Sequence, residues 1–387
     1  MNALHKPALF FFLTATLLLT WTLLPFSQAL AVEPLALNEV KYWAYQIQKL
    51  DEPGAIEALA ASRYDMLVVD PTVTSDWNFN AKQMVQTLKV SKAYDGVHRK
   101  LVIAYIDIGE AEEWRWYWYG RDTYEQNGLC KQSYVTAIQS WAPWVVACDP
   151  DGWGGNYPVA YWDSAWQDVV LGGTTLGSSL NLYFDSIMDE VVQDGFDGVY
   201  LDWVEAWEMD AVQQRAENEG KDAGQEMLNL IQAIKDYGQQ SNPSFIVIQQ
   251  NSSELLNEVG AASLRGAVDA IAQEGVWWDG DAIDDDWNNP AGYDQANGPD
   301  LINYYLPRLR NYRNNGFPVF VCEYAVVHAA EAYSKAAAEG FIGYATRRPL
   351  SHLTTTPPFP ATVPPPSPVG DSDLVIAPIM LLLDEQP

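Results

Sequence analysis

The sequence predicts an α/β protein, a (β/α)8 TIM barrel with a Trp-rich insertion after the third strand and a Pro-rich C-terminal tail. Eight short apolar runs alternate with longer polar or amphipathic segments, and polar residues follow most of the runs. The 387 residues are 48% hydrophobic, which is enough for a large core. An open doubly wound sheet is the alternative fold, but no Gly-x-Gly-x-x-Gly loop follows the first run to support a dinucleotide-binding version.

The apolar runs are the expected strands, and their number is the one that a closed barrel needs. In chain order they are Tyr42–Ile47, Met66–Val69, Leu101–Ile106, Gly198–Leu201, Phe245–Ile248, Ala267–Ala272, Pro318–Val321 and Phe341–Tyr344. Helices are expected between several of them, at Pro53–Ser62, Ala81–Tyr94, Ser179–Asp194, Lys221–Gln239 and Ala329–Glu339. This alternation predicts parallel strands with right-handed crossovers.

Polar and mostly acidic residues follow the expected strands. After the second to eighth strands come Asp70, Asp107 with Glu110, Asp202, Gln249 to Asn251, Glu274, Glu323 with Tyr324, and Thr346 to Arg348. Any one of these residues could simply cap the next helix. In a barrel, however, the strand ends meet at one face, so the whole series indicates a pocket lined by carboxylates.

Two irregular stretches interrupt the alternation. Residues Glu112–Ser178 hold many aromatic residues, and loops of this length in a compact domain are usually functional. We expect Trp116 and its neighbours to lie in the cleft, where rings can stack on sugars, and most of the other rings to pack in a small core of their own. The acids between Trp277 and Trp287 do not have EF-hand spacing, so a solvated acidic loop is favoured over a Ca²⁺ site.

The N-terminal segment of the chain predicts export. Residues Met1–Ala31 combine Lys6, a long apolar stretch and a small-x-small site, as in a secretory signal peptide; an uncleaved membrane anchor is the alternative. The expected domains are the signal at 1–31, the barrel at 32–350 and the tail at 351–387. Either fate of the signal places the barrel outside the cytoplasm, so we expect a secreted, extracellular or periplasmic protein.

Cysteine and histidine usage narrows the chemistry. In an oxidising compartment Cys130 and Cys148, which flank one Trp-rich segment, are expected to form a disulfide, and Cys322 is expected to be a buried free thiol. The four histidines show no His-x-His or His-x-x-x-His spacing, which disfavours a zinc hydrolase. We therefore expect no metal and no cofactor.

The net charge of −29 restricts the partners. An acidic surface repels phosphate backbones and anionic headgroups, so nucleic acid is excluded as a partner, and a membrane enters only through an uncleaved signal. A neutral or cationic polysaccharide would be tolerated or attracted. We expect a monomer that acts on such a polymer.

Several strings of the sequence resemble one known family. They are Tyr42–Gln48, Tyr105–Arg115 with its Tyr-x-Asp-x-Gly-Glu core, Gly195–Asp202 with Gly-Phe-Asp-Gly-Val, Gln273–Glu274, Gly340–Tyr344 and Arg347–Leu350. They resemble the endo-α-1,4-polygalactosaminidase-like glycoside hydrolases of family 114, over about Val40 to Leu350, and look closest to a secreted bacterial and archaeal branch. The resemblance implies a (β/α)8 barrel whose strand-four Asp and strand-six Glu are Asp202 and Glu274.

Two carboxylates in one pocket suggest glycoside hydrolysis, in which one acid protonates the leaving oxygen while a carboxylate attacks or activates water. Our hypothesis is that Asp202 is the carboxylate and Glu274 the acid/base, with the reverse assignment open. Asp197 is expected to brace a turn. Expected substrate contacts are Tyr45, Asp70, Asp107, Glu110, Trp116, Trp203, Asn251, Glu323, Tyr324, Tyr344 and Arg347. The alternatives are a non-catalytic carbohydrate-binding barrel and a hydrolase of another α-linked glycan.

Overall fold

The computed structural model describes residues 32–71, 79–124, 130–172, 184–280, 287 and 294–354. The expected signal peptide, most of the Pro-rich tail and the acids at 281–286 lie outside the described residues. The division into signal, barrel and tail therefore stays a prediction. Over the described ranges, no helix has both the length and the apolar composition needed to span a membrane.

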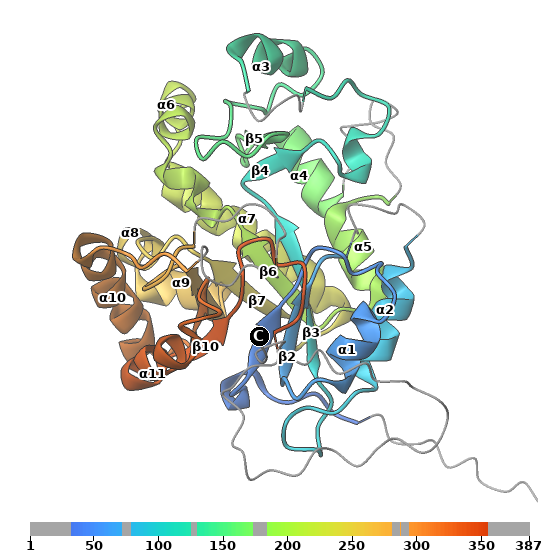
Figure 1. Cartoon of the computed structure of the whole chain (residues 1–387). Helices are drawn as coiled ribbons and strands as arrows, with labels where there is room; N and C mark the ends of the chain where they lie inside the picture. The colour runs from blue at the N-terminus through green and yellow to red at the C-terminus, as the bar shows by residue number, and fades with distance from the viewer. Residues whose placement is uncertain are drawn as a thin grey trace, which may run out of the picture. The chain divides into compact units, whose positions relative to one another are not determined.

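Eight parallel strands follow one another around a nearly closed barrel (Figure 1). They are β1 (Trp43–Tyr45), β2 (Met66–Val69), β3 (Leu101–Asp107), β6 (Gly198–Asp202), β7 (Ile246–Gln250), β8 (Ala270–Glu274), β9 (Val319–Glu323) and β10 (Ile342–Ala345). Each of the seven neighbouring pairs from β1–β2 to β9–β10 is parallel. The predicted (β/α)8 barrel is confirmed.

Four strands extend beyond their apolar runs and end on a carboxylate. These terminal residues are Asp107 of β3, Asp202 of β6, Glu274 of β8 and Glu323 of β9. Asp107 lies opposite Asp202 in the β3–β6 ladder, and Glu274 lies opposite Cys322 in the β8–β9 ladder. The carboxylates are therefore fixed by backbone hydrogen bonds of the sheet and not by mobile loops.

Aromatic side chains fill the barrel and join its first strand to its last. The Trp43 indole Nε1 donates to the carbonyl oxygen of Ile342 at 3.0 Å, and its ring lies 5.8 Å from that of Tyr344. Beneath the mouth, the rings of Tyr45 and Tyr200 are 4.9 Å apart, and both residues are buried. This aromatic interior forms the floor of the region where the strands end.

Helices connect the strands in the order that the alternation predicts. They are α1 (Ala55–Ala61), α2 (Ala81–Lys89), α5 (Ile187–Asp194), α6 (Asp210–Asn218), α7 (Ala223–Ser241), α8 (Leu255–Val259), α9 (Ala261–Ala267), α10 (Pro299–Asn314) and α11 (Ala329–Glu339). The expected helices did not include α6, α8, α9 or α10. Of these, α10 is the longest; it buries only Leu309 and Tyr312 and contains Pro307, so its apolar period is weak. Its start does carry a recognised signal, a proline in the first turn.

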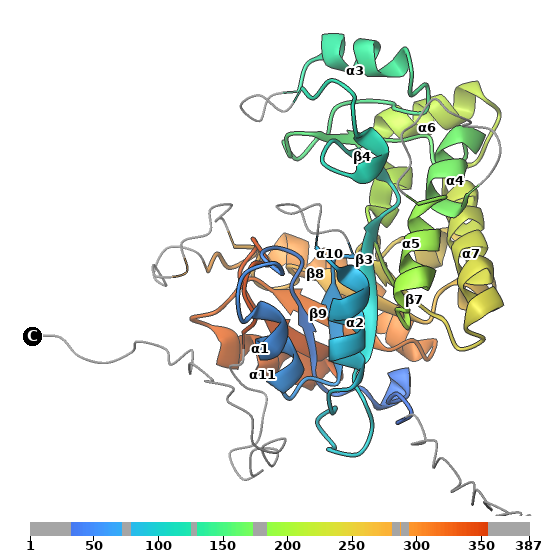
Figure 2. The ribbon, with the colours of Figure 1, turned by 90° about the vertical axis from the view of Figure 1, so that its right-hand side faces the viewer.

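The Trp-rich insertion forms a small layer beyond the end of β3 (Figure 2). Strand β4 (Glu110–Glu112) pairs antiparallel with β5 (Asn156–Pro158), and helices α3 (Gln132–Gln139) and α4 (Ser164–Leu171) flank them. A disulfide joins Cys130 to Cys148, and Cys322 is a buried free thiol. Most rings of the insertion pack together as expected; its buried tryptophans include Trp116, Trp118, Trp144 and Trp166.

Three aspartates brace the opposite, N-terminal end of the barrel. Each aspartate directly precedes a strand: Asp65 precedes β2, Asp197 precedes β6 and Asp269 precedes β8. Each also accepts backbone N–H groups from the neighbouring strand or from residues next to it. Asp65 accepts those of Lys41 and Tyr42, Asp197 that of Val102, and Asp269 that of Val247. Asp197 also accepts two hydrogen bonds from Arg99, at 2.7 and 2.8 Å, and an ion pair from Lys89 at 2.9 Å. These contacts agree with the bracing role expected for Asp197.

Replacing Asp197 with Asn is expected to lower the free energy of unfolding by about 2 to 3 kcal/mol at neutral pH, because Arg99 and Lys89 lose a largely buried counter-charge. Burial raises the pKa of Asp197, but the hydrogen bonds from Arg99 and the charges of Lys89 and Arg99 outweigh it and hold the pKa below its ordinary value. This stabilisation is present above the unfolded-state pKa of about 3.9 and is lost as the pH falls through the lower folded value. Urea unfolding at pH 7 and pH 3 measures both effects.

The control for this variant is Asp236→Asn on the exposed side of α7, which should change stability by less than about 0.5 kcal/mol. Equal stability of the Asp197→Asn and Asp236→Asn proteins at pH 7 would contradict the bracing role.

Candidate functional site

Five partly exposed side chains gather at the ends of β6, β7 and β8. They are Asp202, Trp203, Glu205, Asn251 and Glu274. Asp202 and Glu274 are the last residues of β6 and β8, and Asn251 directly follows β7, the strand between them. Because the negative charge of Glu274 raises the pKa of Asp202, the two carboxyl groups share one electrostatic environment. The strand order thus brings the two predicted carboxylates together.

Asp202 is held by a donor on each oxygen. The Tyr105 hydroxyl donates to Oδ2 at 2.5 Å, and the backbone N–H of Trp203 donates to Oδ1 at 2.8 Å. Burial and the charge of Glu274 raise the pKa of Asp202 to about 7, while these two hydrogen bonds lower it. The carboxyl group therefore titrates near neutral pH with its orientation fixed.

The backbone around Asp202 explains the Tyr-x-Asp-x-Gly pattern of β3. Trp203 has a φ of +55°, and a side chain at Gly109 would place its Cβ only 2.0 Å from the Trp203 carbonyl oxygen. Only glycine at position 109 lets the two loops approach this closely. The Asp107 carboxylate accepts hydrogen bonds from the N–H groups of Gly109 and Glu110, at 3.0 and 2.8 Å, which fixes the same turn.

Asn251 connects Glu274 to a third carboxyl group. Its Oδ1 accepts the backbone N–H of Glu274 at 3.0 Å and the side-chain amide of Gln273 at 2.9 Å. Its Nδ2 donates to Glu205 Oε1 at 3.1 Å. Asn251 has a φ of +53°, a left-handed conformation that asparagine tolerates better than most residues. It therefore positions the end of β8 as well as being accessible to a ligand.

The surroundings of Glu274 combine burial with polar partners. Burial raises its pKa, whereas hydrogen bonds from Gln250 and Tyr324 and the positive charge of Arg348 lower it. Arg348 also pairs with Asp279 and lies over the Tyr324 ring, 5.0 Å from its centroid. The Oε1 atom of Glu274 is buried and has no hydrogen-bond partner among the described residues.

Glu205 is the site residue that the candidate set lacked, whereas Arg348 is one of the polar residues expected after the eighth strand. Glu205 belongs to the short helix η4 (Val204–Glu208) directly after β6. Burial and the charge of Asp202 raise its pKa well above the ordinary value, and its Oε2 is buried with no partner in the described part of the chain. The available signal was a second acid three residues after a strand-terminal one, Asp202-Trp-Val-Glu205.

Two other predicted residues, Asp107 and Glu110, are buried beneath this surface, with exposed fractions of 3% and 0%. Burial and neighbouring negative charges raise the pKa values of both, with Asp202 the main charge acting on Asp107, and Asp107 the main one acting on Glu110. Glu110 Oε2 accepts a hydrogen bond from Asn156 Nδ2 at 3.1 Å. These residues support Asp202 from below and do not present a surface to a sugar.

The expectation that Trp116 lies in the cleft is wrong. Its ring is 2% exposed, and its Nε1 donates to the buried Glu190 at 2.8 Å. The reason is an ion-pair cluster in which Arg115 binds Asp70 at 2.7 Å and Glu112 at 2.5 Å and draws this segment inward. Trp116, Arg115 and Glu190 help to line a cavity of about 20 Å³, room for about one water.

The remaining candidates are also buried and engaged within the protein. Asp70 is 1% exposed and paired with Arg115, and Glu323 accepts the N–H groups of Trp277 and Trp278 at 3.0 and 2.8 Å. Burial raises the pKa of Glu323 to about 8 despite these donors. The others are Tyr45, Tyr324, Tyr344 and Arg347, each at most 4% exposed. Direct sugar contact stays a prediction for the accessible Trp203 and Asn251.

Among the described residues no group of three or more His, Cys, Asp or Glu side chains is arranged to hold a metal ion. The arrangement offers a set of carboxyl groups whose pKa values are raised by burial, that of Asp202 to about 7. Such a set is suited to general acid–base chemistry on an uncharged or cationic substrate.

Comparison with known proteins supports one family. The sequence model described as Glycoside-hydrolase family GH114 matches residues 26–358. An uncharacterized protein of Deinococcus radiodurans is 30% identical over 326 residues, 84% of this chain and 85% of that protein. The uncharacterized protein MJ1477 of Methanocaldococcus jannaschii is 32% identical over 249 residues, 63% of this chain and 58% of that protein.

A solved structure shares the fold. The glycoside hydrolase domain of PelA from Pseudomonas aeruginosa matches with a TM-score of 0.54 at 16% identity, over 81% of this chain and 97% of that one.

Replacing Asp202 with Asn is expected to stabilise the protein above neutral pH. The folded-state pKa of about 7 exceeds the unfolded-state value of about 3.9, so the wild type loses stability as the pH rises from about 4 through 7. Because the neutral amide does not have this loss, the variant should gain about 2 to 4 kcal/mol over the wild type at pH 8 and little at pH 4. Denaturant unfolding across this pH range gives the difference, and a variant less stable than the wild type at pH 8 would contradict the assigned pKa shift.

Proposed function

The chain belongs to the glycoside-hydrolase family GH114, and from this membership we propose that it is an enzyme that cleaves an α-linked amino-sugar polysaccharide, in the manner of an endo-α-1,4-polygalactosaminidase. The observation that carries the proposal is the pair of partly exposed carboxyl groups, Asp202 and Glu274, at the ends of β6 and β8. Glycosidic bond cleavage through an oxocarbenium-like transition state needs such a pair.

The hydrogen bonds of the pair support a division of roles. Asp202 has a donor on each oxygen, Tyr105 Oη and Trp203 N, and such donors favour the charged form. Glu274 has one oxygen, Oε1, with no partner among the described residues, where a proton can reside. We therefore propose Glu274 as the acid/base and Asp202 as the carboxylate that attacks the anomeric carbon or activates a water, although the pKa of about 7 at Asp202, raised partly by the charge of Glu274, supports the reverse assignment.

The electrostatics of the pair fit one shared proton. Each carboxyl group has a pKa raised first by burial, and the charge of Glu274 adds to the rise at Asp202. Two close carboxyl groups resist simultaneous ionisation, so one of them keeps its proton near neutral pH. Such a pair supplies one acid and one carboxylate near neutral pH, as glycosidic bond cleavage requires.

The proposed substrate follows from charge and from the family resemblance. The chain carries 51 acidic against 22 basic residues, and the pocket adds Glu205 to the two central carboxyl groups. A polymer of hexosamine with free amines is partly cationic, so this field would concentrate it at the protein. A polyanionic glycan would be repelled.

We also propose that the protein acts outside the cytoplasm. The disulfide between Cys130 and Cys148 supports this, because such bonds persist in oxidising compartments. The signal-like segment at 1–31 is consistent with the same location.

Asp202→Asn and Glu274→Gln are each expected to lower the rate of hydrolysis at least about a hundredfold, the usual contribution of acid–base or nucleophilic carboxylates. The substrate is de-N-acetylated α-1,4-linked galactosaminoglycan, and new reducing ends together with mass spectrometry of shorter oligosaccharides report cleavage. Because Asp202→Asn is expected to leave the fold intact or stabilised, lost activity is separable from unfolding.

The matched control is Asp300→Asn, an exposed aspartate of α10, which should cleave as the wild type does. Near-normal activity in either pocket variant would overturn its assignment. Binding of the polymer by the wild type without any new reducing ends would instead favour a non-catalytic carbohydrate-binding barrel.

A further inference from the structure

One tryptophan of the insertion is exposed, in contrast to its buried neighbours. Trp153 has an exposed fraction of 43%, whereas Trp116, Trp118, Trp144 and Trp166 are at most 2% exposed. A scattered exposed apolar side chain needs no explanation on its own. Trp153 is different because the protein holds its loop in place with several specific interactions.

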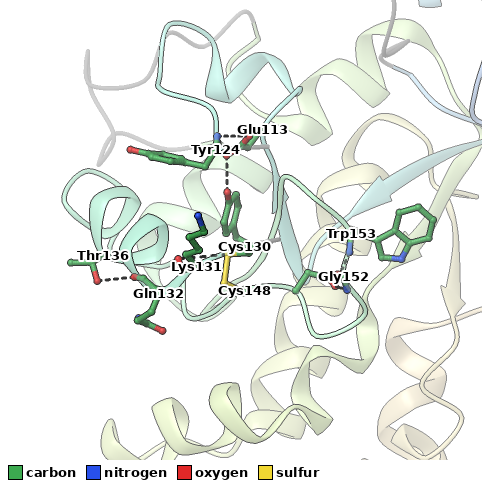
Figure 3. The surroundings of a disulfide bond; sticks show 11 residues. Glu113, Tyr124, Cys130, Lys131, Gln132, Thr136, Cys148, Gly152 and Trp153 are labelled. Atoms are coloured by element: carbon green, nitrogen blue, oxygen red, sulfur yellow. Dashed lines mark hydrogen bonds between the residues drawn. A yellow bond between two sulfur atoms is a disulfide. The ribbon is translucent and has the colours of Figure 1, made fainter. Parts of the chain in front are cut away.

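The loop that carries Trp153 is fixed at its start by a disulfide and a tight turn (Figure 3). It begins at Cys148, which is bonded to Cys130, and the next residue, Asp149, accepts the N–H groups of Gly152 at 2.6 Å and of Trp153 at 3.1 Å. Gly152 has a φ of +87°, a conformation that a larger residue rarely adopts. Figure 3 shows the Trp153 indole projecting away from the disulfide, so the ring is presented on a rigid turn.

The far end of this loop is tied to the layer that supports the proposed active site. Gly155 lies against Trp114, and the next residue, Asn156 at the start of β5, donates from Nδ2 to Glu110 Oε2 at 3.1 Å. The Glu110 N–H in turn donates to Asp107, which is opposite Asp202 in the sheet. A chain of direct contacts therefore connects the exposed ring to the mouth of the barrel.

We propose that Trp153 is a sugar-stacking platform, an additional subsite that binds a hexosamine unit of the polymer away from the bond being cleaved. This inference rests on the proposed function. The indole offers a flat apolar face to the C–H face of a pyranose ring, and tryptophan is also the best aromatic partner for a nearby ammonium group. Asp151, two residues earlier and exposed, adds a negative charge to the same turn. An aromatic face next to an acid suits an amino sugar.

The rigidity of the loop gives the subsite its affinity. A ring on a mobile loop would lose conformational freedom on binding, and this loss would offset much of the contact. Here the disulfide, the Asp149 hydrogen bonds and the Gly152 turn order the loop before the sugar arrives. Chains long enough to reach both the platform and the carboxylate pair should benefit more than short ones.

Trp153→Ala is expected to raise KM for the polymer about three- to tenfold, the size of one lost aromatic contact, and to leave kcat/KM for the shortest cleavable oligosaccharide unchanged. Trp153→Phe should restore most of the polymer affinity. Tyr119→Ala, which removes a 67% exposed ring from the same insertion, is the matched control and should behave as the wild type.

A binding measurement separates this inference from the proposed activity. In the Glu274→Gln background, calorimetric titration with long de-N-acetylated galactosaminoglycan oligosaccharides should show a three- to tenfold weaker affinity for the Trp153→Ala form. Equal affinity and equal polymer KM with and without Trp153 would overturn the platform while leaving the hydrolase intact. If the wild type neither binds nor cleaves the polymer, the proposed function fails and the platform for this sugar fails with it.

Discussion

The structure depends on the burial of carboxyl groups at the C-terminal ends of parallel strands. Asp107, Asp202, Glu274 and Glu323 each end a strand, and burial raises the pKa of all four. Charge is costly in such surroundings unless donors or cations compensate it. Arg115, drawn in by Asp70 and Glu112, and Arg348 supply part of that compensation, and the backbone N–H groups of the following turns supply more. Carboxyl groups that lack such compensation avoid the cost of a buried charge by keeping a proton. These protons give the mouth of the barrel its capacity for acid–base chemistry.

The N-terminal end of the barrel shows what the same residue type does when compensation is complete. Asp197 is as buried as Asp107, yet three hydrogen bonds from cationic and backbone donors and the charges of Arg99 and Lys89 lower its pKa. It is thus a brace that is charged at neutral pH. What distinguishes Asp197 is its two cations, because Asp65 and Glu323 each accept three backbone hydrogen bonds and still have raised pKa values. Paired cations, rather than the residue type or the number of donors, therefore keep a buried carboxylate charged.

The pattern of apolar runs was enough to predict the fold and to select the two central carboxylates, because each strand is a short apolar run and each carboxylate ends one of these runs. The pattern could not tell which of the other candidate residues are buried and which are accessible. Burial of Asp70 and Trp116 is a consequence of Arg115, whose partners lie 45 and 3 residues away in the chain and meet only after folding. Glu205 was missed because a polar residue after a strand is ordinary, and only its approach to Asp202 and Asn251 distinguishes it. Composition likewise counts tryptophans in the insertion but does not tell which of them the disulfide-bonded loop leaves exposed.

Backbone strain at the mouth of the barrel follows from the need to aim donors at these carboxylates. Trp203 and Asn251, which follow β6 and β7, both have left-handed backbone conformations, and such conformations in non-glycine residues persist only where the surroundings enforce them. At Trp203 the enforcing contact is Gly109, whose missing side chain admits the Trp203 carbonyl, and the resulting turn places the Trp203 N–H on Asp202. At Asn251 the enforcing contacts are Gln273, the Glu274 N–H and Glu205. Strain on β6 and β7 therefore orients both central carboxyl groups, and the glycine of β3 is as much a part of that arrangement as the acids themselves.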